Sequence, residues 1–211
     1  MEYSEKQLQI IEAAEKLFAT NGYEGTSVRD IAQEAGVNLA MISYYFGSKE
    51  KLLEALFDCR SSAVMMQLET ALQNNNVEPM QKIYVLIDAL VDRVFTQQYF
   101  HKIMVREQMT QHLSKGPIAD IIHKTKKRNQ EMVRQLIQEG QKKGIFKKNI
   151  DISLMLVTLF GTANQLITTQ PYYREINNLQ DMPDEDFKKL LKKKLSLHLK
   201  TLFKAILTYD A

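Results

Sequence analysis

The sequence predicts an all-α protein of about nine helices, and three observations lead to that fold class. Apolar residues recur at spacings of three and four through most of the chain, which is the period of a helix buried on one side. No apolar–polar alternation bounded by hairpin turns is present, so no strand is expected. The prolines all fall at plausible helix boundaries, where their missing N–H does least harm: Pro79, Pro117, Pro171 and Pro183.

Three short helices are expected first, over about residues 5–20, 28–35 and 39–46. Each follows a residue whose side chain can cap free backbone N–H groups, namely Ser4, Ser27 and Asn38. Six longer helices follow, over about residues 49–73, 79–97, 99–113, 117–143, 152–169 and 184–207. The segment Gln170–Pro183 is predicted to be a polar connection. The longest strongly apolar stretch, Leu154–Ala163, is shorter than the roughly 18 residues of a membrane span, so no membrane association is expected.

The region from Ser27 to Phe46 has the pattern of a helix-turn-helix. Two short helices are joined by Ala35-Gly36-Val37-Asn38, a turn of the length and glycine placement that such units use. The small side chain of Ala32 lets the helices approach, and Val37 and Ile42 dock the third helix on the others. The outer face of that helix then remains free to enter the major groove of DNA.

Two runs of residues, Phe18–Val37 and Tyr44–Leu53, resemble the TetR family of regulators. The resemblance covers about the first sixty residues and is specific, because many positions agree at fixed spacing without gaps. The remainder is similar to the family in being all-helical and of the right length. One short segment, Gly140–Phe146, also resembles the turn before the family's last two long helices. The resemblance implies a helix-turn-helix DNA-binding domain over residues 4–64 and a ligand-binding and dimerisation domain over residues 65–211.

The resemblance also implies which residues touch double-stranded operator DNA. Arg29 falls where members reach a base or a phosphate, and Tyr45 and Lys49 match phosphate-contacting positions. Backbone amides near Thr26 and Ser27, at a helix start, favour phosphate. The full set of implied DNA-binding residues is Thr26, Ser27, Arg29, Asn38, Leu39, Ala40, Ser43, Tyr44, Tyr45 and Lys49.

Charge sets a limit on the DNA-binding surface. The whole chain has a formal net charge of +3, yet its first 51 residues hold eight acidic residues against five Lys or Arg. The binding surface must therefore be a local patch. Leu39 stands where the family commonly has a basic residue, and Ser43 where it commonly has a tyrosine. Fewer charges predict a shallow salt dependence, and Leu39 or Ala40 becomes a candidate reader of a thymine methyl.

In the family, the helices after the fourth form a small-molecule pocket. The many Met and aromatic residues of this half suit an apolar or amphipathic effector, although any single one more often fills core volume. The candidate ligand-binding residues are Tyr84, Phe100, Met104, Gln108, Phe160, Asn164 and Gln165. The identity of the effector stays open.

The last two long helices are the candidate interface of a homodimer. One expected seam consists of Leu154, Val157, Gly161 and Leu166, and the other of Leu191, Leu195, Leu199, Leu202 and Ile206. Two-fold symmetry would place two recognition helices roughly 34–36 Å apart and predicts a palindromic operator.

Enzymes and metal or cofactor sites are not expected. The chain has no phosphate-binding glycine loop and no nucleophile elbow, and its four histidines lack close metal-ligand spacing. The single cysteine, Cys59, cannot form an intrachain disulfide and fits a reducing cytoplasm, and whether it senses redox state stays open.

Three functional hypotheses follow. The first is a repressor that a small ligand releases from DNA. The second is a ligand-independent regulator or activator that a protein partner controls. A weaker rival, motivated by the acidic N-terminal end, is an all-helical interaction module that has lost DNA binding.

Overall fold

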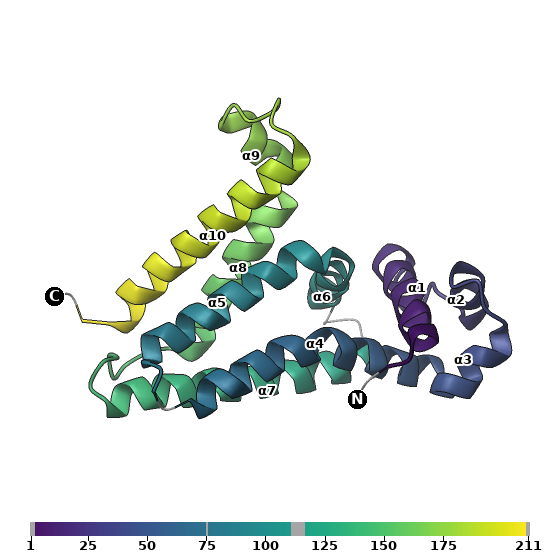
Figure 1. Cartoon of the computed structure of the whole chain (residues 1–211), viewed down its shortest axis with the longest axis horizontal. Helices are drawn as coiled ribbons and strands as arrows, with labels where there is room; N and C mark the ends of the chain where they lie inside the picture. Colours follow the sequence, from purple (N-terminus) through teal and green to yellow (C-terminus); the bar gives the residue numbers. More distant parts are fainter. Residues whose placement is uncertain (1–2, 75, 111–116, 210–211) are drawn as a thin grey trace. The chain divides into compact units, whose positions relative to one another are not determined.

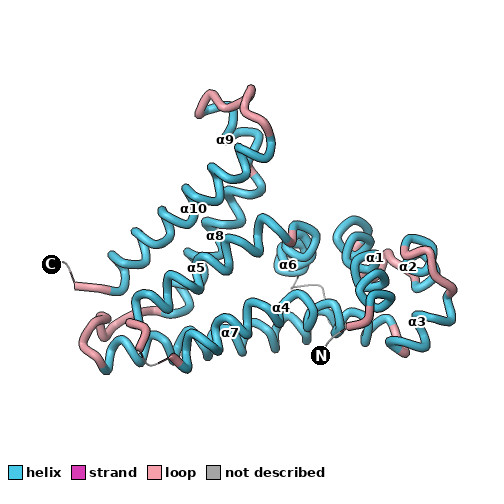
Figure 2. The backbone as a smooth tube through the Cα atoms, viewed as in Figure 1, coloured by secondary structure: helices cyan, strands magenta, loops and turns pink. Residues whose placement is uncertain are grey.

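A computed structural model describes residues 3–74, 76–110 and 117–209. Helices dominate these residues and none of them lies in a strand, so the all-α prediction is confirmed (Figure 1; Figure 2). The helices are α1 Glu5–Asn21, α2 Val28–Glu34, α3 Leu39–Phe46, α4 Lys49–Gln73, α5 Pro79–Thr96, α6 Gln98–Thr110, α7 Pro117–Lys142, α8 Ile152–Thr168, α9 Gln170–Ile176 and α10 Asp184–Leu207.

The segment Gln170–Pro183 contains the helix α9, so its prediction as a purely polar connection was wrong. Arg174 of α9 ties the segment to the start of α10. Its guanidinium forms an ion pair with Asp184 at 2.6 Å and lies 3.9 Å from the ring centre of Phe187. These contacts join residues about ten positions apart, which helical periodicity within a short window does not reveal.

The chain divides into two compact units. The first unit consists of residues 1–63 and 97–125, and the second unit of residues 64–96 and 126–211. The sequence led us to expect one boundary, after residue 64. Residues 97–125 join the first unit because α6 packs on α1, a contact between segments far apart in sequence.

The first unit is built around a core that α1, α2 and α3 share. Ile11 and Phe18 of α1 are fully buried against Ile31 of α2 and Ile42 of α3. Phe57 of α4 stacks edge-to-face on a residue of α6, Phe100, at a ring-centre distance of 5.0 Å. Burial of these apolar side chains fixes α3 on one side only and leaves its other side to solvent.

The second unit is built around α5, α8 and α10, with the last turns of α7. Ile83 and Ile87 of α5 share a buried core with Leu195 and Leu199 of α10. Polar contacts run along the edge of this helix pair: Asp88 accepts hydrogen bonds from Ser196 and Lys200, and Asp92 pairs with Lys192. The lysines of α10 therefore serve in part to hold it on α5.

In the described part of the chain, no helix taken alone is long and apolar enough to cross a membrane. The pair of α8 and α9 meets the length and hydropathy criteria only across a bend of 74°.

Candidate nucleic-acid interface

Side-chain caps define the starts of α2 and α3. The Asp30 amide donates to Ser27 Oγ at 3.2 Å, and the Ser27 amide donates back to Asp30 Oδ2 at 2.8 Å. Hydrogen bonds from the side chain and the backbone of Ser27 lower the pKa of Asp30. At the start of α3, Asn38 Oδ1 accepts from the Ala40 amide at 2.9 Å. These reciprocal bonds satisfy N–H groups that a helix start leaves free.

The turn between α2 and α3 is held by α1. Gly36 adopts a φ of +62°, a backbone conformation that side chains with a Cβ rarely take. The Gln9 side chain donates to the carbonyl of Ala35 at 2.8 Å, and Lys16 pairs with Glu34 at 2.5 Å. The end of α2, and with it the direction of α3, is thereby tied to the longer helix.

A second tie joins α1 to α4. Nε and Nη2 of Arg60 donate to Glu15 Oε2 at 2.8 and 2.6 Å, and Glu15 is buried. Sequence periodicity placed Glu15 on a helix but carried no signal for this pairing, because its partner lies 45 residues away.

The structure brings Leu39, Ala40, Ser43 and Tyr44 together on the exposed side of α3. Tyr44 is 83% exposed, and its ring meets that of Tyr45 at 5.1 Å in a T-shaped pair. Tyr45 is half-buried and packs against the core of the first unit. The face consists of small, apolar and hydroxyl-bearing side chains without a charge.

Arg29 supplies an exposed cation on the preceding helix, α2. It lies in the first turn of α2 and is exposed, and its guanidinium forms no hydrogen bond or ion pair with any described residue. Its fork of N–H donors is therefore free to meet a guanine edge or a phosphate. Ser27, two residues earlier, is also exposed.

Two of the expected DNA-binding residues point inward instead. The Thr26 side chain is buried, and its hydroxyl donates to the carbonyl of Gly22 at 2.8 Å. Lys49 Nζ donates to the carbonyls of Tyr23 and Thr26 at 2.9 and 3.0 Å, and lies 4.1 Å from the ring centre of Tyr23. Lys49 therefore positions the loop before α2 with two of its three N–H donors, which leaves one for a phosphate.

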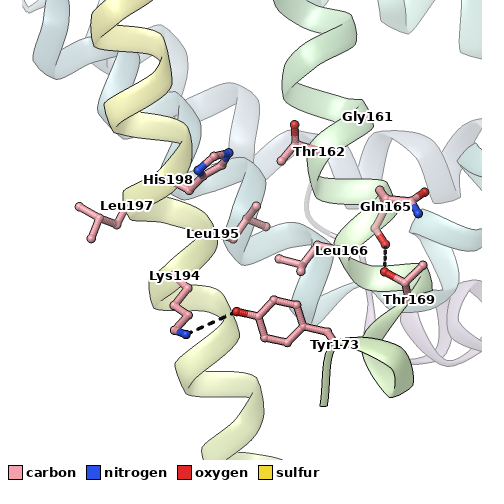
Figure 3. Close-up of a pocket in the computed structure, with 10 residues that line it drawn as sticks. All are labelled: Gly161, Thr162, Gln165, Leu166, Thr169, Tyr173, Lys194, Leu195, Leu197 and His198. Carbon is pink, nitrogen blue, oxygen red and sulfur yellow. Dashed lines mark hydrogen bonds between the residues drawn. The ribbon is translucent and has the colours of Figure 1, made fainter. Parts of the chain in front are cut away.

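The second unit contains an open groove between α8, α9 and α10, with a volume of about 830 Å³ (Figure 3). Lys194 of α10 points toward the hydroxyl of Tyr173 of α9, at 3.5 Å, and forms one edge of the groove. Both apolar and polar residues line the groove: Gly161, Thr162, Gln165, Leu166, Thr169, Tyr173, Lys194, Leu195, Leu197 and His198.

Large apolar side chains beside this groove lie in solvent in the single subunit. Leu154 and Val157 of α8 are 63% and 67% exposed, and Leu197 of α10 is 65% exposed. A Cβ built on Gly161 would meet no atom within 4 Å. The seam predicted on α8 is thus open to a second molecule along most of its length, with Leu166 half-buried in the groove.

The seam predicted on α10 was wrong. Leu191, Leu195 and Leu199 are buried within their own subunit, where the last two belong to the core of the second unit. Leu202 is partly buried against the same core, and Ile206 is also half-buried. Because α10 packs on α5, its leucine stripe faces inward, and Leu197 lies outward instead.

The predicted ligand-binding residues do not form one group. Phe100 is buried in the core of the first unit, and Met104 packs against the same core. In the second unit, Tyr84 packs on the core, Asn164 is half-buried, and Phe160 and Gln165 are exposed on α8. The side chain of Gln108 lies outside the described residues. Of the set, Gln165 lines the groove in Figure 3.

The described residues do not form a metal-binding site. Among residues 3–74, 76–110 and 117–209, no group of three His, Cys, Asp or Glu side chains gathers as a metal site would require. Burial raises the pKa of the Cys59 thiol, which opposes formation of a reactive thiolate.

Comparison with known proteins decides the family. Residues 10–56 match the model of bacterial regulatory proteins of the tetR family, and residues 57–193 match that of the C-terminal region of YsiA-like proteins. The chain belongs to the TetR family. It is therefore a DNA-binding transcriptional regulator and not an enzyme.

Named relatives of this TetR-family regulator are of the same kind. The HTH-type transcriptional repressor NicS of Pseudomonas putida is 30% identical, over 71% of each chain. The fatty acid metabolism regulator protein of Bacillus subtilis is 26% identical, over 78% of this chain and 82% of the relative. The solved structure of FadR from Bacillus subtilis in complex with stearoyl-CoA has 24% identity and a TM-score of 0.64, and covers 92% of this chain and 97% of that one.

Proposed function

We propose that this TetR-family regulator represses transcription by binding a palindromic operator as a homodimer in the cytoplasm. The observation that carries the proposal is the exposed side of α3, where Leu39, Ala40, Ser43 and Tyr44 lie together, with the exposed Arg29 on the preceding helix forming no ion pair with a described residue. A helix presented in this way fits the major groove, and its first residues would contact base edges.

The homodimer would form through the outward sides of α8 and α10. Leu197 lines the groove of Figure 3, Leu154 and Val157 are exposed on α8, and all three side chains would leave water on association. Gly161 lies on the same surface with open space above it, which suits the close approach of a second helix. A two-fold axis through this surface makes the interface self-complementary and gives the operator its symmetry.

The effector would be a small apolar or amphipathic molecule. The comparisons support this choice: a Bacillus subtilis relative is named as a fatty acid metabolism regulator protein, and the solved structure of FadR from Bacillus subtilis holds stearoyl-CoA. Release of DNA requires that the effector bind the DNA-incompetent state more tightly than the DNA-bound state. Long-chain acyl-CoA thioesters are thus the first class to test.

The experiment is a gel-shift titration against the DNA upstream of the protein's own gene, at two salt concentrations. We expect specific binding that Arg29→Ala weakens at least tenfold, while Lys193→Ala, an exposed cation of α10, leaves it unchanged. Addition of acyl-CoA thioesters of increasing chain length should then dissociate the complex.

Two results would overturn parts of this proposal. Failure to select any specific sequence from a random duplex pool would favour an interaction module without DNA binding. Specific binding that no acyl-CoA or fatty acid relieves would favour control by a protein partner.

A further inference from the structure

We propose that this regulator recognises its operator in part through thymine methyl groups, which Leu39 and Ala40 contact at the start of α3. The inference rests on the proposed DNA-binding function and names the base chemistry that the recognition helix reads. Leu39 and Ala40 are the first two residues of α3, and both are exposed. In helix-turn-helix proteins, the first residues of the recognition helix contact base edges.

The side chain of Leu39 has no role in the core of the first unit. It is 40% exposed, and it belongs neither to the buried cluster nor to the partly buried residues that pack against that cluster. Its neighbour Val37, by contrast, packs on the core. The folding of the first unit therefore does not account for an apolar side chain at position 39.

The remaining side chain at this end of α3 is restricted in what it can read. An asparagine recognises adenine through two bonds, with its amide donating to N7 and its carbonyl accepting from N6. Asn38 Oδ1 is already committed to the Ala40 amide at 2.9 Å. While Asn38 caps the helix, its Oδ1 is held against the Ala40 amide and keeps one lone pair, so the side chain is not free to turn into the geometry that two-bond recognition of adenine needs.

Further along α3, Ser43 and Tyr44 offer hydroxyl groups, which both donate and accept and therefore discriminate weakly between bases. The thymine methyl is the apolar group of the major groove, and it complements the methyl groups of Leu39 and Ala40. The structure thus leaves apolar contact as the discriminating interaction at the start of this helix.

The test replaces single thymines by deoxyuridine, which removes the methyl and keeps every hydrogen-bonding group. The operator is first selected from a random pool, and each thymine of one half-site is then substituted in turn. We expect one or two positions per half-site at which binding weakens about fourfold, the effect of one buried methyl group. Substitution at the same position of both half-sites should weaken binding about fifteenfold, because the two effects multiply. At the same positions, 5-methylcytosine should lose less affinity than cytosine.

Leu39→Ala links the effect to its residue. In this variant, deoxyuridine and thymine should bind equally at one of the sensitive positions, whereas Ser43→Ala should keep the full difference. Because Leu39 is exposed and outside the core, the variant should fold, and Leu39→Met, which keeps the apolar contact, should retain the sensitivity.

Three outcomes overturn the inference. If deoxyuridine has no effect at any thymine while specific binding is intact, the inference is refuted and the proposed function stands. A selected half-site that contains no thymine would also refute the inference without affecting the proposed function. Absence of any specific binding refutes the proposed function and this inference together.

Discussion

The ammonium group of Lys82 in α5 donates a hydrogen bond to Glu139 Oε2 in α7 across 2.8 Å, and the Lys82 side chain is completely buried. Lys143, one turn after Glu139, pairs with the same carboxylate at 3.3 Å. Burial opposes ionisation of Glu139, but hydrogen bonds from the two lysines outweigh it and lower the pKa of the carboxyl. A fully buried cation is thus paired with a partly exposed carboxylate.

Removal of that partner should destabilise the protein strongly. Glu139→Ala breaks the ion pair with the buried ammonium of Lys82, and we expect the free energy of unfolding to fall by about 3–5 kcal/mol. Urea denaturation followed by circular dichroism measures the change. Glu131→Ala, which removes an exposed ion pair with Arg134 on the same helix, is the matched control and should cost less than about 1 kcal/mol. Equal effects of the two substitutions would contradict the role assigned to the buried pair.

The same pair predicts a pH dependence. The folded protein holds the pKa of Glu139 below its ordinary value of 4.5, so the ionised carboxylate stabilises the fold above that value. This contribution is lost as the pH falls from about 4.5 through the lowered pKa of the folded state. Between these values the thermal midpoint of the wild type should fall more steeply than that of Glu139→Gln. Parallel curves would show that another group governs acid unfolding.

Gly140 cannot take a side chain. A Cβ at this position would lie 2.1 Å from Cδ2 of Phe146, whose ring is buried in the core of the second unit. Backbone amides of Ile145 and Phe146 both donate to the carbonyl of Gly140, so the chain has little room to shift. We expect Gly140→Ala to lower the free energy of unfolding by about 1–3 kcal/mol. Gln138→Ala, on the exposed side of the same helix, should be close to neutral, and a neutral Gly140→Ala would show that Phe146 can move away.

The proposed dimer interface predicts a change of assembly state. Leu197→Glu would place a carboxylate on the outward side of α10, where burial without a partner is costly. Light scattering after size exclusion should show a dimer for the wild type and a monomer for this variant, with operator affinity reduced at least tenfold. Val85→Glu alters an exposed apolar residue of α5 and should leave the dimer intact. A dimer that survives Leu197→Glu would place the interface elsewhere.

Lys49 should contribute to both folding and DNA binding. Lys49→Met removes the donor for the carbonyls of Tyr23 and Thr26, and we expect a stability loss of about 1–3 kcal/mol. If the third N–H meets a phosphate, the slope of log affinity against log salt should also decrease in magnitude by about 1. Lys51→Met replaces an exposed lysine two residues further along α4 and serves as the control for stability. A slope that does not change in Lys49→Met would restrict this lysine to a structural role.

The helical fold class and the position of the helix-turn-helix could both be predicted from local sequence patterns. A helix cap joins residues two or three positions apart, so the partners Ser27 and Asp30 lie close together in the sequence as well as in space. The spacing of Ile31 and Ile42 in turn predicts which side of α2 and α3 is buried. Three adjacent aromatics on one helix cannot all face the core, and of those at positions 44–46 it is Tyr44 that is exposed.

The partner of each apolar helix side, in contrast, follows from packing between elements and not from local sequence patterns. The leucines of α10 share one side by periodicity, but packing on α5 turned them into the core and left Leu197 outside. Lys49 lies at a position implied to contact DNA, yet hydrogen bonds to backbone carbonyls 23 and 26 residues away drew its side chain inward. The physical reason is the same in each case: periodicity and capping are local properties, whereas the partner of a helix face is chosen by contacts between segments distant in the sequence.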